Sequence, residues 1–359
     1  MRTPFFKVLL TTFLFPWTVS LTFVMFPVLL SYNPAAAGET LTLMTHDSFN
    51  VSTEVIKRFE KDNDATVRFL KAGDAGTALV QAILSKGNPL ADVFYGVDNT
   101  FLSRALNNDI FIPYTSPALA GIPEKFRLDP RNRLLPVDYG DVCLNYDKAW
   151  FKQHDLAPPT DLADLVKPAY RGLTVVENPA TSSPGLAFLL ATIGRFGEDG
   201  YRDFWKKLRN NDVKVANGWE DAYYGHFSAA SKGDRPIVVS YASSPPAVVH
   251  FSETPLNEAP TAAVVDNDSA FRQIEFVGIL RGTKHPDLAR KLVDFMLGRP
   301  FQEDIPLQMF VFPVNPEAQL PEVFVRHAEV AQHPVQLSPS AIEAGRDRWI
   351  EEWTTTVLR

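Results

Sequence analysis

Four loops of the chain combine hydroxyl groups, a carboxylate and aromatic rings, which together could bind a small charged molecule. In each loop a strand-like run gives way to small or polar residues, and a helix-like run follows. The four loops are Gly73-Asp74-Ala75-Gly76-Thr77, Thr181-Ser182-Ser183-Pro184-Gly185, Asn217-Gly218-Trp219-Glu220-Asp221 and Tyr241-Ala242-Ser243-Ser244-Pro245-Pro246. In an open α/β sheet, ligands bind outside the carboxyl ends of the strands, where such loops lie. Together the loops predict one composite binding site.

Trp219, Tyr241 and Asp74 are suited to a flat cation. Aromatic faces stack on planar rings and attract positive charge, and a carboxylate can pair with it. Trp219 has polar neighbours, and Tyr241 ends a strand directly before two serines. The alternative is that both rings anchor the core and that Asp74 lies in a solvated turn.

The segment Ser183-Pro184 predicts the start of a helix. Serine is a favoured N-cap, and proline is favoured at the first helical position because its fixed φ suits a helix. Free amide groups and aligned peptide dipoles make such a start a place where an anion can bind. A capped helix that binds nothing is the alternative.

Strand-like and helix-like segments alternate along the chain at short intervals. Apolar alternation predicts strands at 41–43, 67–70, 92–95, 173–176, 213–215, 237–241, 262–265 and 273–280. Helical spacing predicts helices at 50–61, 76–86, 100–107 and 285–297, and a closing helix at 338–358. Such alternation is typical of parallel sheets covered by helices. The fold class is therefore predicted as α/β.

The alternation pauses near residues 139–160 and then resumes, which predicts two lobes. We expect residues 38–138 and about 260–310 to form the first α/β lobe, and residues 139–259 to form the second. Residues 311–359 are expected to be a C-terminal helical segment packed on the lobes. Each lobe would contain a parallel or mixed sheet, with a ligand cleft between the lobes, because clefts between domains are preferred ligand sites.

The first 37 residues read as a secretory signal peptide. Arg2 and Lys7 precede an apolar run from Val8 to Leu30, and Ala35-Ala36-Ala37 offers a cleavage site. An uncleaved membrane anchor is the alternative, because the run is long.

Without the two basic residues of this segment, 33 basic and 42 acidic residues leave a net charge of −9. That charge disfavours nucleic acid and anionic membranes as partners.

Motifs of enzymes and metal sites are poorly represented. The chain has no Gly-x-Ser-x-Gly elbow, zinc helix or phosphate loop, and its seven histidines show no paired spacing. Cys143 is the single cysteine, so no intrachain disulfide can form, and we expect a buried, inert thiol. Tyr223-Tyr224 is the one pair that could hold ferric iron, although on a helix one of two neighbours is usually in the core.

These features together resemble the periplasmic thiamine-binding proteins of ABC importers, over nearly all of residues 41–357. The resemblance is carried by Met44-Thr45-His46-Asp47-Ser48-Phe49, Ala91-Asp92-Val93, Gly96-Val97-Asp98-Asn99, Val137-Asp138-Tyr139-Gly140, the serine loops, Gly218-Trp219-Glu220-Asp221-Ala222-Tyr223, Ile305-Pro306, Phe312-Pro313-Val314 and Trp349-Ile350-Glu351-Glu352-Trp353. It implies a two-lobed periplasmic-binding-protein fold and a non-enzymatic, monomeric carrier without a cofactor. Such a carrier binds thiamine or thiamine phosphates in the periplasm and delivers them to the permease and ATPase subunits of the importer.

By motif match, the resemblance places the ligand at Asp74, Ala75, Ser182, Ser183, Trp219, Tyr241, Ala242, Ser243 and Ser244. His46 stands where family members carry a tyrosine, Ala247 where an aromatic residue is expected, and Phe310 where a tryptophan is expected. His46 and Phe310 are therefore additional candidates in a thinner aromatic cage. A ferric-iron carrier of the same fold, a carrier for another cationic or phosphorylated molecule, and a secreted enzyme stay open as alternatives.

Overall fold

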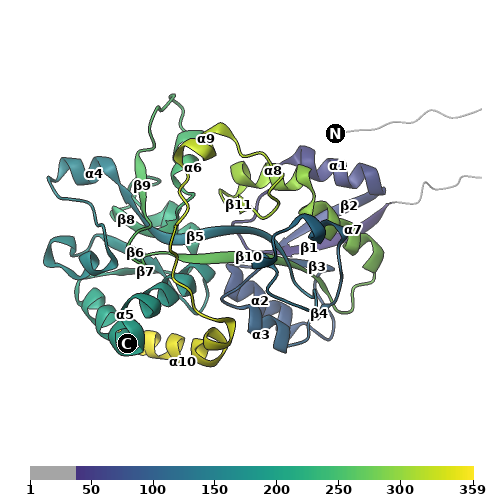
Figure 1. Cartoon of the computed structure of the whole chain (residues 1–359), viewed down its shortest axis with the longest axis horizontal. Helices are drawn as coiled ribbons and strands as arrows, with labels where there is room; N and C mark the ends of the chain where they lie inside the picture. The colour runs from purple at the N-terminus through teal and green to yellow at the C-terminus, as the bar shows by residue number, and fades with distance from the viewer. Residues whose placement is uncertain (1–37) are drawn as a thin grey trace, which may run out of the picture. The chain divides into compact units, whose positions relative to one another are not determined.

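The computed structural model describes residues 38–359 (Figure 1). The predicted signal peptide at residues 1–37 lies outside the described residues. Within residues 38–359, no helix is long and apolar enough to cross a membrane. The described residues form one compact unit, Gly38–Arg359.

One mixed sheet runs through this unit. Its strands are β1 Glu39–Thr45, β2 Ala65–Lys71, β3 Val93–Asp98, β4 Phe111–Ile112, β5 Leu135–Asp147, β6 Thr174–Glu177, β7 Lys214–Ala216, β8 Ile237–Tyr241, β9 Thr261–Val264, β10 Phe271–Leu280 and β11 Phe312–Pro313. The main order is β2-β1-β3-β10-β5-β8-β6-β7, while β9 and β11 pair with β5 and β4 pairs with β10. The α/β class predicted from the alternation is confirmed.

Two parallel groups of strands lie at the ends of this sheet. Strand β1 is parallel to β2 and β3, and β6 is parallel to β7 and β8. The long antiparallel strands β5 and β10 join the groups by hydrogen bonds (Figure 1). The lobe boundary predicted at residue 138 falls within β5, and the division into lobes stays a prediction.

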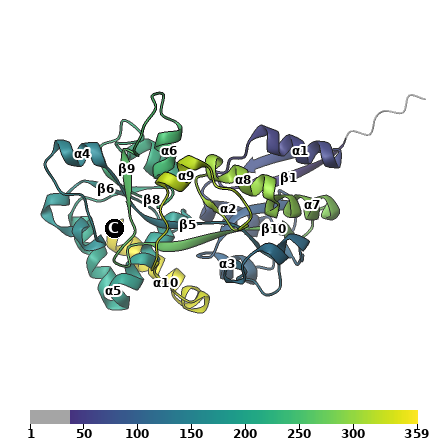
Figure 2. The same ribbon diagram turned by 45° about the horizontal axis from the view of Figure 1, so that its top comes forward.

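Helices cover both faces of the sheet (Figures 1 and 2). They are α1 Thr53–Asn63, α2 Ala75–Leu84, α3 Leu102–Asn107, α4 Lys148–Gln153, α5 Ser183–Asn210, α6 Pro245–His250, α7 Pro286–Leu297, α8 Arg299–Gln308, α9 Glu322–His327 and α10 Pro339–Val357. Helix α1 has a side-chain cap, because the Ser52 hydroxyl accepts from the N–H of Val55. The apolar face predicted on α7 is confirmed, because Ala289, Leu292, Val293 and Met296 are buried.

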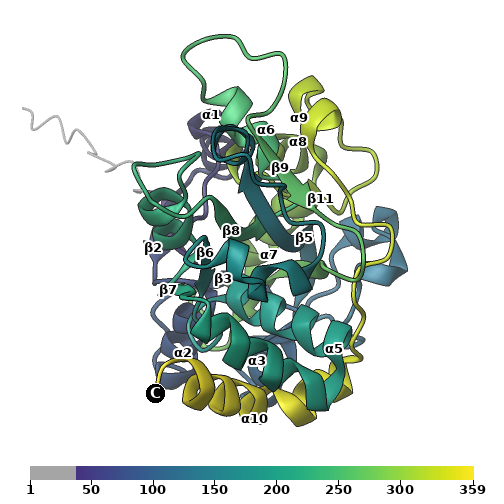
Figure 3. The same ribbon diagram turned by 90° about the vertical axis from the view of Figure 1, so that its left-hand side faces the viewer.

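The closing helix α10 packs alongside α5, as Figure 3 shows. The rings of Trp205 and Trp353 meet edge to face with centroids 5.5 Å apart. Helix α5 is interrupted at Gly197, whose φ of 75° lies in the left-handed region. The C-terminal helix predicted from the sequence is confirmed, and it fixes α5, whose first turn reaches the candidate site.

Candidate functional site

A pocket of about 290 Å³ lies where several of the predicted loops meet. Seven of the eleven predicted site residues line it, namely His46, Asp74, Ala75, Ser183, Trp219, Tyr241 and Phe310. They lie at or just after the ends of β1, β2, β7 and β8, in the first turns of α2 and α5, and just before β11. The composite site predicted from separate loops is therefore brought together in space.

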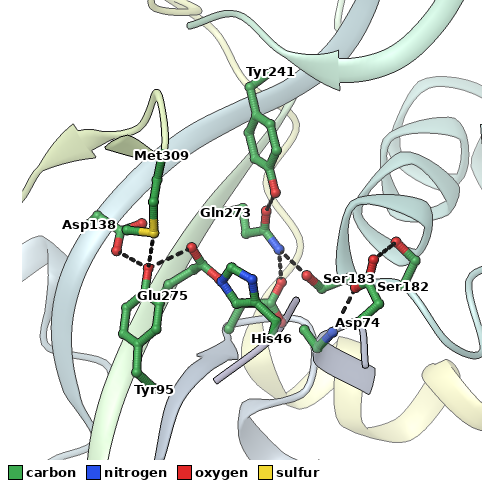
Figure 4. Close-up of polar contacts among 12 residues, drawn as sticks. His46, Asp74, Tyr95, Asp138, Ser182, Ser183, Tyr241, Gln273, Glu275 and Met309 are labelled. Atoms are coloured by element: carbon green, nitrogen blue, oxygen red, sulfur yellow. Dashed lines mark hydrogen bonds and ion pairs between the residues drawn. The ribbon is translucent and has the colours of Figure 1, made fainter. Parts of the chain in front are cut away.

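Asp74 is the polar centre of this pocket. It is the N-cap of α2, and its carboxylate accepts from the N–H of Ala75 at 2.7 Å. It also accepts from the Ser182 hydroxyl at 3.1 Å (Figure 4) and from the N–H of Trp219 at 3.0 Å. One carboxylate thus connects the starts of α2 and α5 with the Trp219 loop.

The first turn of α5 differs by one residue from the prediction. Ser182, not Ser183, is the N-cap, and neither hydroxyl caps the helix. The Ser182 hydroxyl donates to Asp74, and the N–H of Ser183 points to the same carboxylate at 3.4 Å. The anion at this helix start is therefore a side chain of the protein itself. Burial raises the pKa of Asp74, although these donors and the charge of His46 work against the rise.

A second polar group is built on β10. The carboxylate of Glu275 lies 3.3 Å from Nε2 of His46 and accepts from the Tyr95 hydroxyl at 3.0 Å (Figure 4). The Tyr95 hydroxyl also lies 2.6 Å from the carboxyl of Asp138. Gly96 makes room for this arrangement, because a Cβ there would lie 2.5 Å from Cδ2 of His46.

The protonation states in this group differ because the neighbours differ. Burial lowers the pKa of His46, but the charge and hydrogen bond of Glu275 outweigh it, so the pKa of His46 lies above its ordinary value. Burial raises the pKa of Glu275, and His46 brings it below its ordinary value. Burial and the charge of Glu275 raise the pKa of Asp138 well above the ordinary value. Their contact thus favours the charged forms of His46 and Glu275, whereas burial favours the neutral form of Asp138.

Gln273 links the pocket wall to the first turn of α5. Its amide oxygen accepts from the Tyr241 hydroxyl at 2.6 Å, and its Nε2 donates to the Ser183 hydroxyl at 2.7 Å (Figure 4). It also donates to Asp98, whose pKa burial raises to about 6. Sequence reasoning missed Gln273 and Glu275. Their signal was two polar residues at positions i and i+2 of an apolar strand, which point to the same face.

Aromatic rings line much of the remaining wall. Trp219 stacks on the buried Tyr223 with centroids 5.0 Å apart and meets Tyr224 edge to face. Tyr224 lines the pocket and is half exposed, whereas Tyr223 lies in the core, so the prediction that one of the two neighbours is buried is confirmed. Phe49 and Phe251 add two further rings that sequence reasoning missed.

Four predicted residues do not line the pocket: Ser182, Ala242, Ser243 and Ser244. All four are buried. The Ser243 hydroxyl donates to the carbonyl of Phe310 at 2.6 Å. The Ser244 hydroxyl lies 2.8 Å from that of Ser240 and accepts from the N–H of Tyr241. The three serines thus form hydrogen bonds to residues that line the pocket and do not line it themselves.

The side chains that line the pocket are suited to binding a flat, charged molecule. Rings of Trp219, Tyr224 and Tyr241 can stack on a planar group, and the carboxylates of Asp74 and Glu275 favour positive charge. Within residues 38–359, no group of three or more His, Cys, Asp or Glu side chains could hold a metal ion. Burial raises the pKa of the Tyr223 phenol, which disfavours the tyrosinate that ferric iron would require.

Residues 88–328 match the family of bacterial extracellular solute-binding proteins. The chain is 31% identical to a thiamine-binding periplasmic protein of Salmonella typhimurium, over 92% of this chain and 98% of that protein. It is 30% identical to a thiamine-binding periplasmic protein of Brucella suis, over 94% of this chain and 98% of the relative. A solved periplasmic thiamin-binding protein superposes with a TM-score of 0.79 at 29% identity, covering 89% of this chain and 96% of that one.

Proposed function

Because the chain belongs to the family of bacterial extracellular solute-binding proteins, we propose that it captures thiamine and delivers it to an ABC importer. The observation that carries the proposal is a pocket lined by aromatic rings and carboxylates, in a chain similar over nearly its whole length to thiamine-binding proteins. The family resemblance drawn from the sequence motifs is confirmed.

Thiamine matches this pocket in its chemistry. Its thiazolium ring carries a positive charge, and its aminopyrimidine is flat and has hydrogen-bonding groups. Trp219 and Tyr241 would stack on the rings, and Asp74 and Glu275 would favour the cation. Ala75, Ser183 and His46 are proposed as further contacts. Ser182, Ala242, Ser243 and Ser244 are proposed to act from behind the wall.

Thiamine phosphates are proposed as further ligands. The pocket is lined by Lys71, by His46, whose pKa lies above its ordinary value, and by Ser183, whose hydroxyl accepts from Gln273 and keeps its own proton for donation. The proposed carrier acts as a monomer in the periplasm, uses no catalytic step and docks on the permease and ATPase subunits of the importer.

The test is titration of residues 38–359 with thiamine, followed by calorimetry and tryptophan fluorescence. Among the described residues, Trp219 is the only tryptophan in the pocket lining, so binding should change its emission. In a Trp219→Phe variant the fluorescence response should disappear while calorimetry still detects binding. Trp150→Phe is the matched control, because Trp150 stacks on His154 outside the pocket. Absence of heat with every thiamine form, together with a response to ferric ion or another solute, would refute the proposal.

A further inference from the structure

Phe310 has an unusual backbone for a bulky residue. Its φ of 55° lies in the left-handed region, which is unfavourable for a side chain with a Cβ. Residues held in such conformations cluster at ligand sites and persist only when the surroundings fix them. Phe310 lines the pocket. Its conformation therefore calls for a contact that holds it in place.

Ser243 supplies that contact. Its hydroxyl donates to the carbonyl oxygen of Phe310 at 2.6 Å, and Ser243 is fully buried. On its other side, Phe310 belongs to a cluster with Ala247, Phe312 and Phe324. The hydrogen bond thus holds the backbone of Phe310, and packing in this cluster holds its ring.

The ring of Phe251 packs against the ring of Phe310 and is exposed to solvent. Phe251 is the C-cap residue of α6, and its N–H donates to the carbonyl of Ala247, four residues earlier, at 3.0 Å. Its ring meets that of Phe310 edge to face, with centroids 5.6 Å apart and an interplanar angle of 65°. Phe251 lines the pocket, yet 65% of it is exposed. Burial in the core thus does not account for its aromatic side chain.

We propose that Phe251 and Phe310 form an aromatic wall on which the ring of the ligand packs, and that Ser243 is a positioning residue acting through Phe310. The proposal rests on the proposed function, because it concerns the same pocket.

The wall is tested by calorimetric titration of thiamine into wild type and Phe251→Ala. We expect the variant to bind about tenfold more weakly, in line with the loss of one aromatic contact. Its melting temperature should stay close to that of wild type, since the ring is exposed. Leu84→Ala is the control, because Leu84 is exposed outside the pocket. Equal affinities of wild type and Phe251→Ala would refute the proposal that the ligand packs on Phe251.

The role of Ser243 is tested by a double-mutant cycle with Ser243→Ala and Phe310→Leu. Ser243→Ala should weaken binding severalfold in wild type and have little effect when Phe310 is already leucine. Ser269→Ala is the matched control, because the buried Ser269 hydroxyl donates to the Val264 carbonyl outside the pocket. Equal losses in both backgrounds would overturn the positioning role. A wild type that binds no thiamine would refute the proposed function and the wall together, whereas thiamine binding with unaffected variants would refute the wall and leave the function standing.

Discussion

At the scale of single residues, the buried carboxyl groups in and around the pocket have different partners. Asp74 has several donors, Glu275 has an imidazole, and Asp138 has the Tyr95 hydroxyl. Glu177, at the end of β6, is buried with neither carboxyl oxygen hydrogen bonded. The His46–Glu275 pair and the buried Glu177 should therefore make the stability of the fold depend on pH in different ways. The substitutions His46→Gln and Glu177→Gln separate the two effects.

The His46–Glu275 pair should stabilise the fold most in mildly acidic solution. The pKa of His46 is raised, so its contribution is complete below about pH 6.5 and is lost as the pH rises through the higher folded pKa. We expect His46→Gln to cost on the order of 1 kcal/mol more at about pH 5.5 than at about pH 9. Urea unfolding at both pH values measures this difference. A cost that grows toward high pH would contradict the charged pair.

Glu177→Gln should have the opposite signature. Burial raises the pKa of Glu177 well above its ordinary value, so the unfolded chain ionises first and stability falls as the pH rises above about 4.5. Because glutamine does not ionise, the variant does not lose stability in this way as the pH rises. Relative to wild type, the variant should therefore gain on the order of 1 kcal/mol per pH unit until the folded carboxyl ionises. Thermal unfolding between about pH 5 and pH 8 measures the gain, and a constant difference would show that Glu177 is ionised when buried.

At the scale of elements, two long strands and one interrupted helix position the residues of the pocket. Strand β10 carries Glu275, which lines the pocket, and Gln273, which is hydrogen bonded to Tyr241 and Ser183, while β5 pairs with both β10 and β8. Helix α5 begins at Ser183, beside Asp74, and bends at Gly197 before it packs on α10. The bend lets one continuous segment serve both the pocket and the C-terminal helix.

Gly197→Ala should destabilise the protein by about 1 to 2 kcal/mol through the backbone alone. A Cβ at this position would meet no atom within 4 Å, but the φ of 75° is unfavourable for alanine. Gly121→Ala is the matched control, because its Cβ would also lie in open space and its φ is outside the left-handed region. Urea unfolding of the two variants gives the comparison. Equal stabilities would mean that α5 straightens without cost.

Local elements could be predicted from the sequence more fully than the candidate site. Alternation located β1, β2, β3 and β8 because strand and helix periods are local properties. The spacing of Gln273 and Glu275 puts both on one face of β10, but the residues that they meet depend on the pairing of β10 with β3 and β5, which no local pattern contains. The Ser182 and Ser183 hydroxyls were assigned to a helix cap and an anion, because their partner Asp74 is more than 100 residues away in sequence.

At the scale of the whole molecule, charge should guide the ligand. Residues 38–359 carry 33 basic and 42 acidic side chains, a net charge of −9. A negative field attracts a cation from solution, and salt screens it. This effect acts on the rate of encounter rather than on the contacts in the pocket.

Thiamine should therefore associate more slowly as salt is added. We expect the association rate constant to fall about two- to fivefold between low and physiological ionic strength, with little change in the dissociation rate constant. Stopped-flow tryptophan fluorescence measures both rates. An association rate that is constant or rises with salt would exclude steering by the net charge.

The buried thiol has a practical consequence for measuring these rates. Cys143 is the single cysteine of the chain, it is fully buried, and burial raises its pKa well above the ordinary value, so it is protonated and shielded from maleimide reagents. A cysteine introduced at an exposed position such as Leu84 can then be labelled selectively in the folded protein. The native chain thus needs no cysteine removal before it is converted into a fluorescent biosensor.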